Sequence, residues 1–121
     1  MGSTMYTHTE RKTVNGERVE QIMQLTKRQY QMLYKQRDPQ HRTVHKTRRC
    51  FLWMEHYFQL DILREPCTER CRNLALLETY TTKENLELPS FLDVVKEVTM
   101  DPHYSMHYLS CLLYTSDAAD E

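Results

Sequence analysis

The feature that most constrains the fold is an alternation of side-chain type at every second position in the middle of the chain. Residues 43–53 and 57–63 are rich in Val, Thr, aromatic residues and Leu, which favour extended backbone. Successive side chains of a β-strand point to opposite faces, so this period predicts two strands rather than helices. In the later run one face holds Phe58, Leu60 and Ile62, and the other holds Tyr57, Gln59 and Asp61.

The earlier of these two runs sorts its charged residues in the same way. One face carries Lys46, Arg48 and Cys50, and the opposite face carries Thr47, Arg49, Phe51 and Trp53. We therefore expect Lys46 and Arg48 to project from one face and Arg49 from the other.

A β-hairpin is expected near the N-terminus. Asn15 and Gly16 form the dipeptide that best tolerates the positive φ angles of a two-residue hairpin turn. The strand-like residues on either side, 6–13 and 17–25, are the two predicted strands.

One helix follows the hairpin. Thr26 and Gln29 have the spacing of a capping box, which predicts a helix over 27–37. The other expected elements are a strand over 73–82, a short helix over 90–95 opened by Pro89, and a strand near 97–99.

These elements predict one small α+β domain of mostly antiparallel strands, which suits a chain of 121 residues. Polar residues on one face of nearly every strand suggest a sheet curled around a polar interior. A flat sheet with one solvated face would give the same alternation, so the sequence leaves both arrangements open.

The net charge of −1 hides two halves of opposite sign. Residues 1–50 hold 11 Lys and Arg against 4 Asp and Glu, whereas residues 51–121 hold 5 against 13. A basic half favours an anionic partner. Alternatively, the two halves pair with each other in the fold.

Cysteine usage and hydropathy bear on the cellular compartment. The chain shows no secretory signal and no apolar run long enough to cross a bilayer, so we expect a soluble cytoplasmic protein with reduced thiols. Cys67 and Cys71 form a C-x3-C pair, but a zinc site needs two further ligands at matching spacing. We therefore predict no metal there.

The end of the chain differs from the rest. Residues 111–121 back-translate to a string that resembles the transposon-end adapter of sequencing libraries, read in frame. We therefore expect the natural domain to cover residues 1–110 and residues 111–121 to be non-native.

Several short motifs in order carry a resemblance to a known family. They are Lys46 to Phe51, Tyr57 to Ile62, Leu74 to Glu78, Leu88 to Leu92, and Glu97 to Ser105. Together they resemble the CYTH-like superfamily, most closely the domain that ends the TRPL-translocation-defect proteins. In those proteins a NadR-like P-loop domain that binds GTP or ATP comes first, so we expect this chain to be a piece of a longer protein.

The resemblance implies an antiparallel barrel, or tunnel, whose inward basic residues hold phosphate groups. Lys46 and Arg48 match its inward lysine and arginine, Arg11 and Lys12 match an earlier Thr-x-Arg-Lys motif, and Arg18 is a further candidate contact. Guanidinium and ammonium groups bind phosphate oxygens through charge-assisted hydrogen bonds. The barrel would be incomplete, because the first Glu-x-Glu-x-Lys strand is missing.

Catalytic relatives hold divalent metal on paired Glu-x-Glu motifs. Here Glu78 matches the first glutamate of the later motif, but Tyr80 stands in place of the second and Gln59 at a position that is often Glu. The remaining candidate ligands for Mg²⁺ are Asp61 and Glu97.

Three functions follow from these observations. We expect a non-catalytic module that binds a phosphoinositide or polyphosphate, with peripheral contact on endomembranes and no cofactor of its own. The alternative is a Mg²⁺-dependent phosphohydrolase or cyclase of the triphosphate-tunnel type. Nucleic-acid binding through the basic half is a third reading, weakened by the absence of a ribonucleoprotein-type motif.

Overall fold

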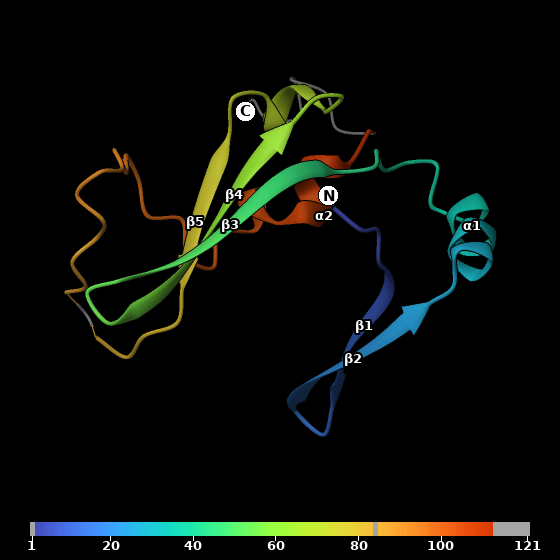
Figure 1. The fold of residues 1–121 in the computed structure, drawn as a ribbon, viewed down its shortest axis with the longest axis horizontal. Helices are drawn as coiled ribbons and strands as arrows, with labels where there is room; N and C mark the ends of the chain where they lie inside the picture. The colour runs from blue at the N-terminus through green and yellow to red at the C-terminus, as the bar shows by residue number, and fades with distance from the viewer. Residues whose placement is uncertain (1, 84, 113–121) are drawn as a thin grey trace. The chain divides into compact units, whose positions relative to one another are not determined.

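The structure is a computed structural model that describes residues 2–83 and 85–112. Its backbone forms two compact units, one up to Asp38 and one from Pro39 onward (Figure 1). Each unit contains one antiparallel sheet and at least one helix, which confirms the α+β class. The described strands form two separate sheets and no closed barrel.

The N-terminal unit begins with the expected hairpin of β1 (Tyr6–Val14) and β2 (Glu17–Leu25). The turn residues Asn15 and Gly16 have φ angles of 52° and 81°, the left-handed values that this dipeptide accepts at low cost. The dipeptide therefore sets the register, in which Val14 lies opposite Glu17 and Tyr6 lies opposite Leu25.

Helix α1 (Lys27–Lys35) follows, two residues shorter than expected at its C-terminal end. Its start is the predicted capping box: Thr26 Oγ1 accepts from the Gln29 N–H at 3.1 Å, and Gln29 Oε1 accepts from the Thr26 N–H at 2.9 Å. The Tyr30 ring packs on Tyr6 of β1 at a centroid distance of 4.9 Å.

The C-terminal unit is built on a three-stranded sheet in the order β3-β4-β5. Its strands are β3 (His45–Trp53), β4 (His56–Arg64) and β5 (Ala75–Thr79). Strand β5 is shorter than the predicted 73–82, because Asn73 adopts a left-handed φ of 59° that is incompatible with a strand.

The described residues of this unit also form three short helices: η1 (Glu69–Cys71), η2 (Pro102–Tyr104) and α2 (Met106–Ser110). The predictions of a helix over 90–95 and a strand near 97–99 were wrong. Residues after Pro89 form only a turn, with the Leu92 N–H donating to the Pro89 carbonyl at 3.1 Å. Pro89 is fully buried and Phe91 packs on Phe51, so packing against the sheet replaces local helix formation.

The two faces of the sheet are covered differently. One face carries the rings of Phe51, Trp53 and Phe58, and Phe58 is fully buried. On the other face Leu63 packs with Cys71 of η1 and Leu109 of α2 into a small core. This second face also carries Lys46, Arg48 and Asp61, as the alternation predicted.

Only Cys111 and Leu112 of the expected non-native segment lie within the described residues, and both contact the domain. Cys111 is buried and forms a β-bridge with His41. The Leu112 N–H donates to the Gln40 carbonyl at 2.6 Å. The start of this segment therefore has packing partners in the domain.

No helix within residues 2–83 and 85–112 is both long enough and apolar enough to span a bilayer.

The turn between β3 and β4 gives a first prediction. Met54 and Glu55 hold φ angles of 50° and 66°, the same left-handed geometry as Asn15 and Gly16 but with side chains that disfavour it. Glu55→Gly should raise the free energy of unfolding by about 0.5–1 kcal/mol, because the relieved strain exceeds the extra entropy that glycine loses. Urea unfolding monitored by Trp53 fluorescence measures it.

Glu55→Ala is the matched control for this turn. It removes the same carboxylate but keeps the Cβ atom, so it should leave stability within about 0.5 kcal/mol of the parent chain. Equal gains from the two variants would show that charge, and not backbone strain, limits the turn.

A second prediction concerns the end of the chain. A chain truncated after Ser110 should be less stable by about 1–3 kcal/mol than one truncated after Leu112, because it loses the buried Cys111 side chain and two backbone-acceptor contacts. Those contacts are the Leu112–Gln40 bond and the bond from Arg70 to the Cys111 carbonyl. Thermal melts of the two chains test this, and coincident melts would contradict it.

Candidate functional site

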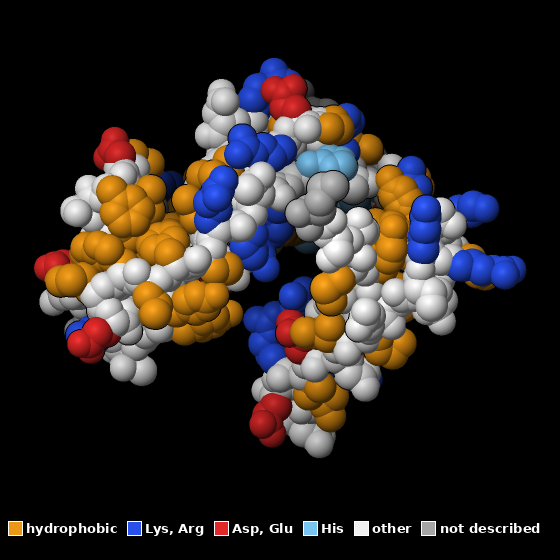
Figure 2. Space-filling model, viewed as in Figure 1, with side chains coloured by type: hydrophobic (Ala, Val, Ile, Leu, Met, Phe, Trp, Pro, Cys, Tyr) orange, Lys and Arg blue, Asp and Glu red, His pale blue; other side chains and the backbone are white. Residues whose placement is uncertain are grey.

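The candidate site lies on the face of β3 and β4 that is opposite the aromatic rings. Arg48 stands directly across from Asp61 in the antiparallel register, and Lys46 is across from Leu63. Arg49 stands across from Leu60 and therefore belongs to the other face. Figure 2 shows Lys and Arg side chains gathered over this sheet, with apolar side chains gathered toward the segment that follows β5.

Both cations bind the same carboxylate. Arg48 donates from Nε to Asp61 Oδ1 at 2.8 Å and from Nη2 to Asp61 Oδ2 at 2.9 Å. Lys46 Nζ donates to Asp61 Oδ2 at 3.0 Å. The Arg48 contact is therefore bidentate, which fixes the plane of its guanidinium group. We call these three residues the Lys46–Arg48–Asp61 triad.

The burial of Asp61 explains why it needs two partners. Its residue surface is 8% exposed, and its face also holds Leu63 on the same strand and Leu76 across on β5. A carboxylate among apolar side chains must be paired to remain charged. The hydrogen bonds from Arg48 hold the pKa of Asp61 below its ordinary value; burial opposes this effect, and Lys46 adds to it.

The triad leaves an excess of positive charge at the surface. Its two cations share a single anion, and the side chains of Arg48 and Lys46 stay 47% and 27% exposed. The hydrogen bonds to Asp61 also raise the pKa of Arg48, so its guanidinium is always charged. A guanidinium carries five N–H groups and an ammonium three, so both retain donors that point away from Asp61.

The same face carries further polar side chains that the sequence did not single out as site residues. Gln59 donates to Glu78 Oε1 at 3.1 Å across β4 and β5. A side-chain hydrogen bond with Cys50 raises the pKa of Tyr57 above its ordinary value. The period-two pattern of β3 and β4 is the signal that places Cys50, Tyr57 and Gln59 on the same face as Arg48.

The three hairpin candidates lie in the N-terminal unit and divide between its two faces. Arg11 and Arg18 share one face, whereas Lys12 falls on the other. Arg11 Nε bonds Glu20 at 2.6 Å, and Lys12 lies 4.0 Å from Glu10. Lys46 and Arg48 therefore lie together within the C-terminal unit, whereas the three candidates of the hairpin do not share one face of it.

The carboxylates proposed as metal ligands do not converge. Asp61 has both oxygens occupied by the triad, Glu78 accepts from Gln59, and Glu97 lies outside the strands, where it accepts from Thr99 at 2.9 Å. Among the residues that the structure describes, no group of three His, Cys, Asp or Glu side chains is close enough to hold a metal ion.

Comparison with known proteins adds no identification. The chain matches no protein-family model, no curated protein and no solved structure. Functional inference therefore depends on the chemistry of the triad, which presents two cations with one shared counter-charge and can accept an anion from solvent.

The triad gives a third prediction, on pH dependence. Because the folded pKa of Asp61 is lowered, its pairing stabilises the fold above the ordinary carboxyl pKa of 3.8 and is lost as pH falls through the folded value. Asp61→Asn should lower the free energy of unfolding at pH 7 by about 1–2 kcal/mol, reduced by solvent screening of Arg48. The gap between the two proteins should shrink as pH falls below about 4.

Glu78→Gln is the matched control for the pH experiment. It removes a carboxylate from the same face without removing a hydrogen-bond partner of Lys46 or Arg48; Glu78 acts on Arg48 only through its charge. Urea unfolding at a series of pH values measures all three proteins. A constant gap between the parent and Asp61→Asn down to low pH would contradict the assignment of the acid-sensitive pair.

Proposed function

We propose that the C-terminal unit is a non-catalytic module that binds a phosphorylated ligand through Arg48 and Lys46. The observation that carries this proposal is the triad: two cations on one open face share a single buried carboxylate. Arg48 and Lys46 together carry one positive charge more than Asp61 neutralises, and both keep N–H groups that Asp61 does not use. Phosphate oxygens suit such groups, because they accept several charge-assisted hydrogen bonds at once.

Asp61 has a defined role in this proposal. Its bidentate contact orients the guanidinium of Arg48 before any ligand arrives, so less side-chain entropy is lost on binding. Its negative charge also weakens the attraction for an anion, which favours ligands with several phosphate groups over a single one. A phosphoinositide head group or a short polyphosphate has this character.

The resemblance to CYTH-like domains supports the same reading. In those domains the positions that match Lys46 and Arg48 lie on the inner wall of a phosphate-binding tunnel. In this proposal the chain belongs to a longer cytoplasmic protein that binds GTP or ATP through a separate P-loop domain. Peripheral contact with endomembranes would bring the module to phosphoinositide head groups.

The enzyme alternative has less support from the geometry. Triphosphate-tunnel chemistry uses Mg²⁺ held by carboxylates in fixed positions. Both oxygens of Asp61 already accept from cations, and Glu97 is not part of a described strand. Binding without catalysis is therefore the function that we propose.

A fourth prediction tests the site directly. Arg48→Ala should weaken binding of a soluble inositol polyphosphate by about 10–100-fold, the equivalent of about 1.5–3 kcal/mol for hydrogen bonds to a charged group. Arg48→Lys should recover only part of this loss, because an ammonium keeps the charge but not the planar fork. Isothermal titration at fixed ionic strength, with tripolyphosphate as a second ligand, gives the dissociation constants.

Arg49→Ala is the matched control, since Arg49 has the same charge on the opposite face of the same strand. It should leave affinity within about twofold. Equal losses at positions 48 and 49 would reject the face assignment and point to nonspecific charge attraction. No loss at either position, in chains that melt like the parent, would reject phosphate binding at the triad.

A further inference from the structure

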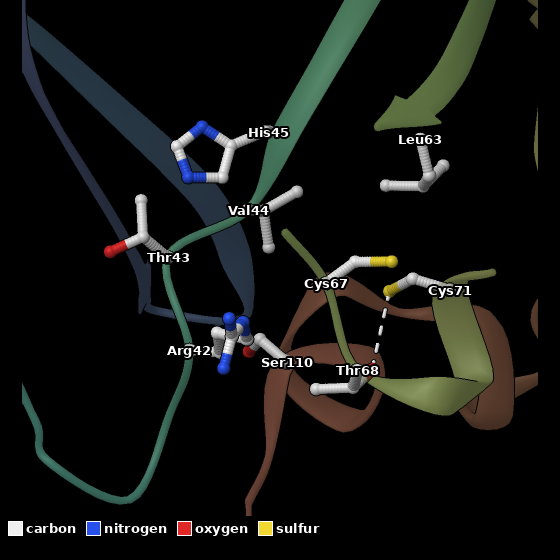
Figure 3. A pocket seen from close by; sticks show the side chains of 9 residues that line it. All are labelled: Arg42, Thr43, Val44, His45, Leu63, Cys67, Thr68, Cys71 and Ser110. Atoms are coloured by element: carbon white, nitrogen blue, oxygen red, sulfur yellow. Dashed lines mark hydrogen bonds between the residues drawn. The ribbon is translucent and has the colours of Figure 1, made fainter. Parts of the chain in front are cut away.

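Two of the four cysteines line one small cavity in the C-terminal unit, which includes no residue of the triad. Cys67 and Cys71 lie there with Val44, Leu63 and Ser110 around them (Figure 3). Cys67 also packs against the core cluster to which Cys71 belongs. The view in Figure 3 shows both sulfur atoms directed into the same space.

The backbone of this segment explains how a C-x3-C pair comes together. Thr68 is extended and caps the single turn of η1, whose Cys71 N–H donates to the Thr68 carbonyl at 3.0 Å. This turn brings the side chain of Cys71 back toward that of Cys67. The Thr68 hydroxyl bonds the Leu109 carbonyl and lies 3.5 Å from Cys71 Sγ, which holds the turn against α2.

The two thiols differ in their access to solvent. Cys71 is 2% exposed, whereas Cys67 is only half-buried. A small reagent can therefore reach Cys67 first, with Cys71 held beside it. This arrangement, an accessible thiol with a buried neighbour, is typical of a dithiol in which one cysteine attacks and the other resolves.

We propose that Cys67 and Cys71 form a redox-active dithiol that closes to an intramolecular disulfide when it meets a small disulfide such as oxidised glutathione. Cys67 loses its proton and attacks one sulfur of the oxidant, whose S–S bond breaks and releases one glutathione. Cys71 then loses its proton and attacks Cys67, which releases the second glutathione. The two cysteines lose two electrons, and the released thiols take up the electrons and both protons.

Disulfides in cytoplasmic proteins are usually transient and redox-sensing, so the proposal agrees with reduced thiols as the resting state. It is independent of the phosphate site. The remaining cysteines have different settings: Cys50 is exposed on β3, and Cys111 is buried at the β-bridge with His41.

The test uses the full chain carrying Cys50→Ser, which removes the exposed thiol that would otherwise cross-link molecules. The protein is equilibrated with mixtures of oxidised and reduced glutathione, quenched with acid, alkylated and cut with trypsin. Cleavage after Arg64, Arg70 and Arg72 separates the two cysteines. The expected product is peptide 65–70 disulfide-linked to peptide 71–72. Glutathione left on Cys67 beside an alkylated Cys71, or a disulfide to Cys111, would overturn the proposal.

Two controls test whether the native fold promotes the disulfide, or whether the short distance between Cys67 and Cys71 in the sequence is sufficient. In Cys71→Ala the second step is lost, so Cys67 should keep its glutathione. The same titration of the parent in denaturant gives the equilibrium constant for forming the Cys67–Cys71 disulfide in the unfolded chain. The equilibrium constant for disulfide formation against glutathione should be at least about tenfold larger in the native protein than in the denatured one. An equal or smaller constant in the native protein would overturn the proposal.

Discussion

The antiparallel pairing of β3 with β4 determines what both faces of the larger sheet can do. Because side chains alternate strictly along each strand, a slip of one residue would exchange the faces. The observed register sets Arg48 opposite Asp61 and Phe51 opposite Phe58. Charge is thereby collected on one side and aromatic surface on the other, and the aromatic side contains the fully buried Phe58.

The triad shows how a partly buried carboxylate and an open cationic surface depend on each other. Asp61 sits beside Leu63 and Leu76, where an unpaired charge would be costly, and Arg48 and Lys46 compensate for that cost. Two cations face one carboxylate, so one positive charge remains in excess, and the side chains that carry it are partly exposed to solvent. The same pairing that stabilises the fold thus leaves a surface suited to anions.

The charged residues of the two halves of the chain form ion pairs both between the halves and within one half. In the triad, cations of the basic half pair with Asp61 of the acidic half, as expected if the two halves pair with each other in the fold. In the hairpin, Arg11 pairs within its own half, with Glu20 across the strands. Neighbouring strands therefore neutralise charge locally, and the net sign of a half does not by itself indicate a binding surface.

Sequence alone determined the elements whose causes are local. The Asn15–Gly16 turn, the Thr26–Gln29 capping box and the faces of β3 and β4 follow from backbone preferences and period two, which act over a few residues. It also singled out Lys46 and Arg48 as neighbours on one face. It missed α2, since five residues capped by Ser105 are too few to show a helical period.

Only the tertiary structure decided which distant residues share a partner. Residues 89–91 pack on the aromatic face and form no helix, because burial of Pro89 and the contact of Phe91 with Phe51 outweigh local preference. The choice of Asp61 as the common acceptor, and the approach of Cys67 to Cys71 over one cavity, depend on how strands and turns are packed. Such contacts join residues far apart or across a turn, and no period in the sequence encodes them.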